Sequence, residues 1–405
     1  MRGKCFLFVL LLGLAATIGT TQPAEGAGFA LYEGSARGNA LGGAVVGRAD
    51  DPSAVYYNPA GITQLPGLQI LAGATAIMPS TTVVRDDGTY HAQGHVWVPP
   101  HFYATYQFSD KLWFGLGAFS PYGLGVEFDS NWPGRANNIK TIITSVNMNP
   151  TIAWKMTDQL SVALGLDIMY FNLDMKKTVL AYPLRVDTEL KGDSVGYGGN
   201  IALHYRPTDW LSAGVSYRSQ VTQNLKGDAK FNPNFAVFTD SSVNGSITLP
   251  DEICFGVAVK PAPQWSVEAG FIWTRWSTYK DLTMEFGNAL GTVSSPKNWH
   301  DTMRYNLGVE YKATDWLDLR AGYVFDEEPI PDSTADYIVP ADDRHNFSVG
   351  PGFHFGPWNV DISYTYIYIT DRDASTSLAP GVAGTHSRFV NGDAHLVGAS
   401  VGYKF

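Results

Sequence analysis

The sequence predicts a fourteen-stranded antiparallel transmembrane β-barrel, and three observations lead to this all-β fold class. Only 16% of the 405 residues are charged, whereas a typical soluble protein has ~25%. Aromatic residues reach 13% and there are 42 glycines, more than a helical core uses. The longest apolar run, Phe6–Ala16, is shorter than the ~20 residues that a spanning helix needs. Strands that alternate lipid-facing and lumen-facing residues give this profile.

The first 26 residues have the pattern of a secretory signal peptide. Arg2 and Lys4 precede the apolar stretch Cys5–Ala16, and Ala24-Glu25-Gly26 offers small residues for cleavage. Residues 1–26 are therefore predicted to be removed, which leaves Cys254 as the sole cysteine and no internal disulfide. The formal net charge of −10, without a clustered basic face, gives no support to a nucleic-acid partner.

Short polar turns recur at intervals of 42 to 54 residues. They lie at Asp110, Asp158, Asp209, Pro263, Asp315 and Pro357. Asp and Pro suit tight turns, and a Trp just beyond several of them suits the aromatic girdle at a membrane interface. Six turns on one rim separate seven hairpins, so fourteen strands are expected within residues 68–405.

The segments between these turns alternate as half-buried strands do. In Trp358–Tyr368, for example, the even-numbered residues are apolar or aromatic, whereas Asn359, Asp361 and Ser363 take the other face. Seven longer connections then fall on the opposite rim, and Asn172–Ser194 and Gln220–Ser246 are two of these predicted loops.

Residues 27–67 precede the first strand and do not fit this pattern. They are rich in glycine and alanine and lack sustained alternation. On physical grounds the segment is a disordered tail, a periplasmic extension or a plug inside the lumen, because a barrel of this size has an interior that must be filled by water or protein.

A set of motifs stands in order along residues 27–405. They are Ala27-Gly28-Phe29, Arg48-Ala49-Asp50-Asp51, Asn58-Pro59-Ala60-Gly61-Ile62-Thr63, Ser120-Pro121-Tyr122-Gly123-Leu124, Asn149-Pro150-Thr151, Leu249-Pro250-Asp251, Arg320-Ala321-Gly322-Tyr323 and Val339-Pro340-Ala341-Asp342-Asp343-Arg344. This set resembles the bacterial FadL/TodX family, outer-membrane transporters for long-chain fatty acids and aromatic hydrocarbons. The resemblance implies a fourteen-stranded barrel in a Gram-negative outer membrane, with residues 27–67 as a hatch, or plug, in its lumen.

Two groups of residues gain a role from this resemblance. The hatch motif Asn58-Pro59-Ala60 is either a tight turn that holds the plug or the anchor of a hatch that moves when ligand binds, and Phe29 would be the apolar tip beside the ligand. Pro121, Gly123 and Gly125 interrupt the third strand, since Pro lacks a ladder donor and Gly often marks kinks. They mark either an ordinary strand end or, as in the family, an inward kink that forms a lateral portal.

Charged residues on the lumen face are expected to form a mutually paired network around the plug. They are Asp167, Arg218, Glu268, Arg304, Glu310, Asp318, Arg320, Arg344 and Asp361. A fatty-acid carboxylate nevertheless needs a cation, and Arg218 and Arg304 are the ligand-binding candidates because both lie toward the outer half of their strands. No nucleophile elbow, metal-ligand spacing or phosphate-binding loop is found, so no enzyme activity, metal or cofactor is expected.

The function expected from these features is passive uptake of a hydrophobic small molecule across the outer membrane, with hatch movement and lateral exit into outer-membrane lipid. We expect a monomer. A long-chain fatty acid is favoured, and an aromatic hydrocarbon is the alternative within the family. A general porin, a lipase-type barrel enzyme and a structural or surface-recognition barrel are the alternatives from other functional classes.

Overall fold

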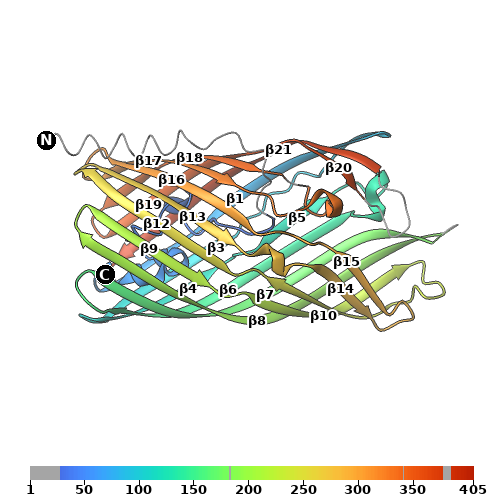
Figure 1. Ribbon diagram of the computed structural model, residues 1–405, viewed down its shortest axis with the longest axis horizontal. Helices are drawn as coiled ribbons and strands as arrows, with labels where there is room; N and C mark the ends of the chain where they lie inside the picture. The colour runs from blue at the N-terminus through green and yellow to red at the C-terminus, as the bar shows by residue number, and fades with distance from the viewer. Residues whose placement is uncertain (1–27, 182–183, 341, 377–384) are drawn as a thin grey trace.

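The computed structural model describes residues 28–181, 184–340, 342–376 and 385–405, so the predicted signal peptide lies outside it. The sheet closes on itself, because β1 (Leu68–Arg85) pairs antiparallel with both β3 (Pro100–Ser109) and the last strand, β21 (Thr385–Lys404). Figure 1 shows the resulting barrel, with the strands tilted against its long axis. Within the described ranges, no helix is long and apolar enough to cross a membrane.

Fourteen strands make up the wall where the structure describes it, which confirms the predicted number. Beside β1, β3 and β21, the continuous ones are β6 (Lys140–Lys155), β7 (Leu160–Ala181), β8 (Leu184–Thr208), β17 (Leu317–Asp326) and β18 (Arg344–Phe355). Six are split into pairs: β4 (Leu112–Phe119) with β5 (Gly123–Glu127), β9 (Leu211–Arg218) with β10 (Val221–Asn232), β11 (Ser241–Leu249) with β12 (Glu252–Ala262), β13 (Trp265–Thr274) with β14 (Asp281–Phe286), β15 (Thr292–Pro296) with β16 (Thr302–Lys312), and β19 (Trp358–Ile369) with β20 (Arg372–Thr376). The short β2 (Gly88–His91) folds back on the end of β1.

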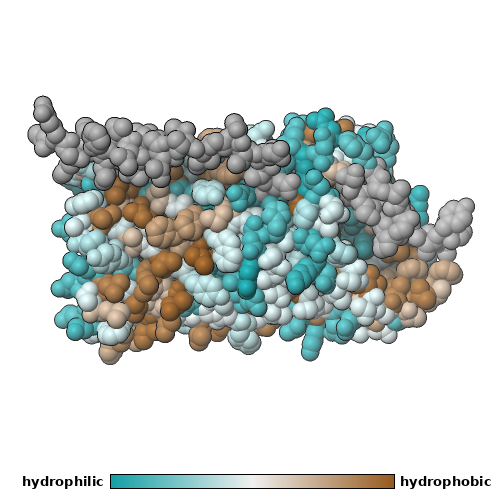
Figure 2. Space-filling view, viewed as in Figure 1, coloured by the Kyte–Doolittle hydropathy of each residue, from teal (hydrophilic) through white to brown (hydrophobic). Residues whose placement is uncertain are grey.

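The face of the wall that carries the apolar side chains changes from the outer to the inner one along a single strand. Near the short turns, Leu164 of β7 faces outward and is 58% exposed, whereas Asp167 is buried inside. Farther along β7 the assignment is reversed, since Phe171 and Leu173 are buried inside and Asp174 lies on the outer face. The half with an apolar exterior is the half that fits the membrane, and it lies on the left of Figure 2, where the apolar side chains gather near the C-terminus. The other half has a polar exterior and an apolar interior.

The prediction of loops at Asn172–Ser194 and Gln220–Ser246 is wrong. β7 and β8 pair from end to end across the first of these segments, and β10 and β11 occupy most of the second. The ladder continues because the period-two alternation continues, with the apolar residues now inside instead of outside.

Residues 28–67 lie within the barrel and form α2 (Ala36–Ala40), α3 (Ala54–Tyr57) and the 3-10 helix η1 (Pro59–Gln64). Three other 3-10 helices lie in the outer connections: η2 (Pro133–Ala136), η3 (Trp276–Thr278) and η4 (Asp332–Thr334). Helix α2 contacts β17, β18, β19 and β21, whereas η1 contacts β4, β6, β7 and β8. The N-terminal segment, residues 28–67, therefore reaches both sides of the lumen.

Asn58 fastens the N-terminal segment to the wall. Its side-chain oxygen accepts a hydrogen bond from the Ala60 amide at 3.2 Å and so caps η1, in which Pro59 is the first residue. Its amide nitrogen donates to the Val46 carbonyl at 2.9 Å and to the Leu203 carbonyl of β8 at 3.1 Å. One buried side chain thus closes a local turn and joins that turn to the barrel.

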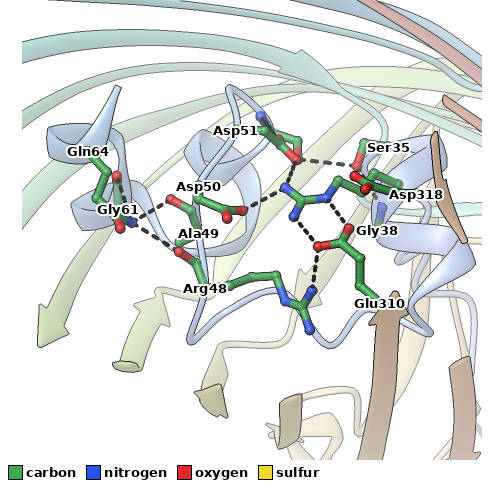
Figure 3. Close-up of polar contacts among 12 residues, drawn as sticks. Ser35, Gly38, Arg48, Ala49, Asp50, Asp51, Gly61, Gln64, Glu310 and Asp318 are labelled. Carbon is green, nitrogen blue, oxygen red and sulfur yellow. Dashed lines mark hydrogen bonds and ion pairs between the residues drawn. The ribbon is translucent and has the colours of Figure 1, made fainter. Parts of the chain in front are cut away.

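Ion pairs hold the N-terminal segment at the end of the barrel that bears the short turns. Glu310 of β16 contacts Arg37 at 3.1 Å, Arg48 at 3.3 Å and Arg320 at 2.7 Å. Figure 3 shows Glu310 beside Arg48, with Asp50 close by. Since Arg37 and Arg48 belong to the N-terminal segment and Arg320 to the wall, Glu310 links the two.

A similar carboxylate lies deeper in the lumen. Glu268 of β13 is fully buried, accepts hydrogen bonds from the Gly47 and Arg48 amides, and pairs with the Arg48 guanidinium at 3.2 Å. Asp361 of β19 pairs with Arg320 at 2.5 Å. The lumen charges are thus satisfied largely by one another and by the N-terminal segment.

Replacing Glu310 by Ala should loosen the N-terminal segment, because three guanidinium groups lose a shared partner and breaking a buried pair costs ~3–5 kcal/mol. We expect faster proteolysis within residues 28–67 and greater leakage of small polar solutes in liposomes. The matched control is Asp315→Ala, since Asp315 pairs with Lys312 on the fully exposed rim and such pairs add little. Equal proteolysis of the two variants would contradict the anchoring role.

Deleting residues 27–66 should leave a folded barrel, because the closing ladder between β1 and β21 uses only residues beyond Leu68. Leakage of small polar solutes should rise, since the deleted residues fill the lumen. Heat-modifiable gel mobility reports folding, and liposome swelling reports leakage. If the deletion variant fails to fold, the N-terminal segment is part of the folding core and not a separable plug.

Candidate functional site

The third wall strand is broken where the sequence places Pro121. β4 ends at Phe119, β5 begins at Gly123, and β5 pairs with β6 alone. The last pair that joins β4 to the second strand is Phe102 with Ala118. Beyond this point the wall lacks its regular ladder on one side of the third strand.

Backbone groups of the N-terminal segment replace the missing ladder bonds. The Leu31 amide donates to the Pro121 carbonyl at 2.8 Å, and the Gly123 amide donates to the Phe29 carbonyl at 3.0 Å. Ala30 and Tyr122 form the antiparallel bridge between these bonds. The interruption therefore leaves neither the Pro121 carbonyl nor the Gly123 amide unsatisfied, because the segment inside the lumen bonds to both.

The two glycines of β5 lie against side chains, not beside an empty gap. A Cβ atom at Gly123 would be 2.7 Å from Cδ1 of Leu31, and one at Gly125 would overlap the ring of Trp97. The absence of side chains in β5 therefore lets one residue of the N-terminal segment and one of the outer wall approach this strand closely.

Aromatic rings enclose Phe29 at the start of the N-terminal segment. Its ring centroid lies 4.9 Å from that of Trp276, 5.6 Å from Trp299 and 5.9 Å from Tyr122. Gly28, at φ +46°, is packed against the same two tryptophans, and a Cβ there would be 2.8 Å from Trp299. This cluster holds the start of the segment next to the interruption.

A cavity of about 410 Å³ lies between the N-terminal segment and the interrupted wall. Its lining is mainly apolar and includes Phe29, Leu31, Trp97, Leu124 and Val126. The structure thus brings Phe29 together with Gly123 and Gly125 in one lining. Pro121 is not part of the lining, although its carbonyl holds the adjacent Leu31.

The lining of this cavity also contains charged residues, two arginines among them. Arg304 lines it, pairs with Asp326 at 2.5 Å and lies over the Tyr32 ring at 4.4 Å. Arg344 also lines it and donates through Nη2 to the Gly28 carbonyl at 3.0 Å. In the part of the chain that the structure describes, Nε of both arginines lacks a hydrogen-bond partner, and no carboxylate lies within ion-pair distance of Arg344.

The other predicted ligand-binding arginine lies elsewhere. Arg218 pairs with Asp167, donates to the Tyr56 carbonyl at 3.3 Å and borders a separate cavity of about 20 Å³. Sequence reasoning placed Arg344 on the lumen face but did not select it as a ligand-binding residue.

The described residues hold no cluster of histidine, cysteine and acidic side chains that is able to bind a metal. The site is instead an apolar chamber with cationic donors in its lining. Such a chamber is suited to bind an elongated apolar molecule with an anionic head.

Comparison with known proteins identifies the family. The family described as outer membrane protein transport protein (OMPP1/FadL/TodX) matches residues 16–405. A long-chain fatty acid transport protein of Escherichia coli is 26% identical over 454 residues, covering 100% of both chains. A 47 kDa outer membrane protein of Pasteurella multocida is 27% identical over 98% of both chains.

Solved structures agree with the fold. The chain is similar to a FadL homologue of Pseudomonas aeruginosa, with a TM-score of 0.83 and 20% identity over 94% of this chain and 100% of that chain. It is also similar to the Ralstonia pickettii toluene transporter TbuX, with a TM-score of 0.72 and 17% identity over 91% and 98%. With the match to the family over nearly its whole length, the chain belongs to the OMPP1/FadL/TodX family, passive outer-membrane transporters of hydrophobic compounds.

Proposed function

We propose that this protein takes up long-chain fatty acids. The observation that supports this proposal is the arginine in the lining of the apolar cavity, Arg344, which has no carboxylate partner among the residues described. An alkyl chain would occupy the apolar part, and a carboxylate would accept charge-assisted hydrogen bonds from Arg344 and Nε of Arg304. The curated relatives named as long-chain fatty acid transport proteins point in the same direction.

The N-terminal segment also contributes a carboxyl group to this cavity. Glu33 lines it, and burial raises the pKa of the Glu33 carboxyl. A raised pKa favours the neutral form over a charge that would repel an incoming carboxylate. Arg304 and Arg344 are therefore better able to attract a second anion.

Binding and movement are coupled in this proposal. Arg344 donates to the Gly28 carbonyl at the start of the N-terminal segment. A ligand carboxylate that takes this donor removes one bond that holds the segment in place. Phe29–Leu31 would then leave the interrupted strand, and the ligand would exit sideways between the second and third strands, past Gly123 and Gly125.

A sideways exit avoids two costs. Passage along the axis would take an apolar chain through water, at ~25 cal/mol per Å² exposed, or through the ion pairs around Glu310. Exit into outer-membrane lipid avoids both. One copy would suffice, because a closed ladder leaves no sheet edge that requires a partner strand.

Replacing Arg344 by Met should weaken fatty-acid binding by roughly tenfold or more, because a hydrogen bond to a charged group contributes ~1.5–3 kcal/mol. The affinity for a fatty alcohol of equal chain length should change little. Binding of both ligands to purified protein can be measured by tryptophan fluorescence, with Arg206→Met on the exposed rim as the control. Equal losses for acid and alcohol would contradict carboxylate recognition. Binding of toluene but not of fatty acid would support the aromatic alternative.

A disulfide between Cys residues placed at positions 30 and 122 should stop transport. Ala30 and Tyr122 lie opposite each other between two flanking hydrogen bonds, a pairing with Cα atoms ~4.5 Å apart that suits a disulfide. Fatty-acid uptake by cells producing the double variant should be lost when oxidised and return on reduction. The two single cysteine variants are the controls. Full uptake by the oxidised double variant would show that the N-terminal segment does not need to leave the wall.

A further inference from the structure

A stretch of irregular chain, residues 92–99, replaces the outer half of the second wall strand. It is bonded mainly to β1, through two hydrogen bonds between Trp97 and Ile77, one between Ala92 and Thr81 and one between Pro99 and Thr75. Among the backbone bonds that the structure describes, a single one joins this stretch to the third strand, from the Gln93 amide to the Glu127 carbonyl at 2.7 Å. The stretch is thus attached firmly on one side and weakly on the other.

The wall between these two strands has an unbonded interval with defined ends. One end is the Gln93–Glu127 bond, next to which His95 contacts Glu127 at 3.1 Å. The other end is the pair Phe102 and Ala118. Over this interval no backbone hydrogen bond joins the second strand to the third in the part of the chain that the structure describes.

The side chain that fills this interval is Trp97. Its indole ring lies against Gly125 of the third strand, so closely that a Cβ atom there would overlap it. The neighbouring Val96 and Val98 are 61% and 57% exposed, whereas Trp97 is only partly exposed and lines the cavity together with Val98. Trp97 therefore stands between the apolar chamber and the exterior of the wall.

Burial leaves the indole nitrogen of Trp97 without a partner. In the described chain, Nε1 is buried and has no hydrogen-bond acceptor. A buried donor without a partner disfavours the conformation that buries it. Swinging the ring outward would let Nε1 bond to water or to a lipid headgroup, so the closed position is one that the ring is able to leave.

We infer that Trp97 is the shutter of the side opening and sets the width of the molecule that passes. This inference rests on the proposed function, and it adds a specificity-determining residue to the route. A straight alkyl chain needs a small displacement of the ring, whereas a chain that ends in a bulky ring needs a large one. The width of the molecules that can be transported is thus limited by Trp97 in the wall and not by the arginines that bind the head group.

The test compares uptake of a straight-chain fatty acid with that of a fatty acid bearing a fused-ring group at its tail. Trp97→Ala should raise the relative uptake of the ring-bearing acid by roughly tenfold, because an aromatic obstacle is removed from the opening. Trp97→Phe should not raise this relative uptake, since an aromatic ring still fills the opening. This variant removes only the unpartnered indole donor. Because Trp97 also lines the cavity, the affinity of each purified variant for both acids is measured as well, and the uptake ratio is compared with the ratio of the affinities.

The control is Trp154→Ala, since Trp154 faces outward from β6 and is 48% exposed. If Trp97→Ala proves unfolded by heat-modifiable mobility, Trp97→Leu tests the same loss of width. An unchanged uptake ratio in a folded variant would overturn the shutter role and leave the proposed function intact. If the original protein takes up no fatty acid, the proposed function fails, and the shutter is tested with toluene against a three-ring hydrocarbon.

Discussion

Backbone polar groups that are shielded from water must find partners within the protein, and the arrangement of the site depends on this constraint. The break at Pro121 deprives the third strand of its regular neighbour. The backbone of Phe29–Leu31 supplies the partners instead. The hydrogen bonding of the wall therefore depends on the position of the N-terminal segment. If the segment moved, the Pro121 carbonyl and the Gly123 amide would lose their partners. Exposure is tolerable at this place because Gly123 lines a cavity, as do Ser120 and Tyr122 on either side of Pro121.

The exchange of faces along the strands divides the lumen into two environments. At the end with the short turns, Glu268 and Glu310 bind arginines of the N-terminal segment and occupy the axis with charge. At the other end Phe171 and Leu173 are part of an apolar interior. An apolar molecule in the cavity thus faces ion pairs along the axis. Since desolvating or separating buried ion pairs is expensive, these pairs favour the sideways exit that we propose.

The sequence was sufficient for the number of wall strands and for their inner halves, because period-two alternation and the recurring turns are local. The residues that build the site are linked over long distances that no local pattern reveals. Arg48 and Glu310 are 262 positions apart and meet only because the N-terminal segment folds into the lumen. Trp97 was missed because it lies in an irregular stretch before two prolines, where alternation is absent. The predicted loops failed since alternation was interpreted as lipid exposure alone, although it persists beyond the membrane.

The strength of the proposed coupling follows from its contacts. A ligand shifts a conformational equilibrium only by the difference in its affinity for the two states. A carboxylate that displaces the Gly28 carbonyl from Arg344 exchanges one charge-assisted bond for another and removes ~1.5–3 kcal/mol of restraint from the segment. This shifts the equilibrium by roughly ten- to a hundredfold, which is less than the ~10⁴-fold needed to turn a 1:99 equilibrium into 99:1. The packing of Phe29 against Trp276 and Trp299 would still favour closure in this proposal, so release would be transient. Such a balance suits passive uptake, in which the opening must form for each molecule and then close again.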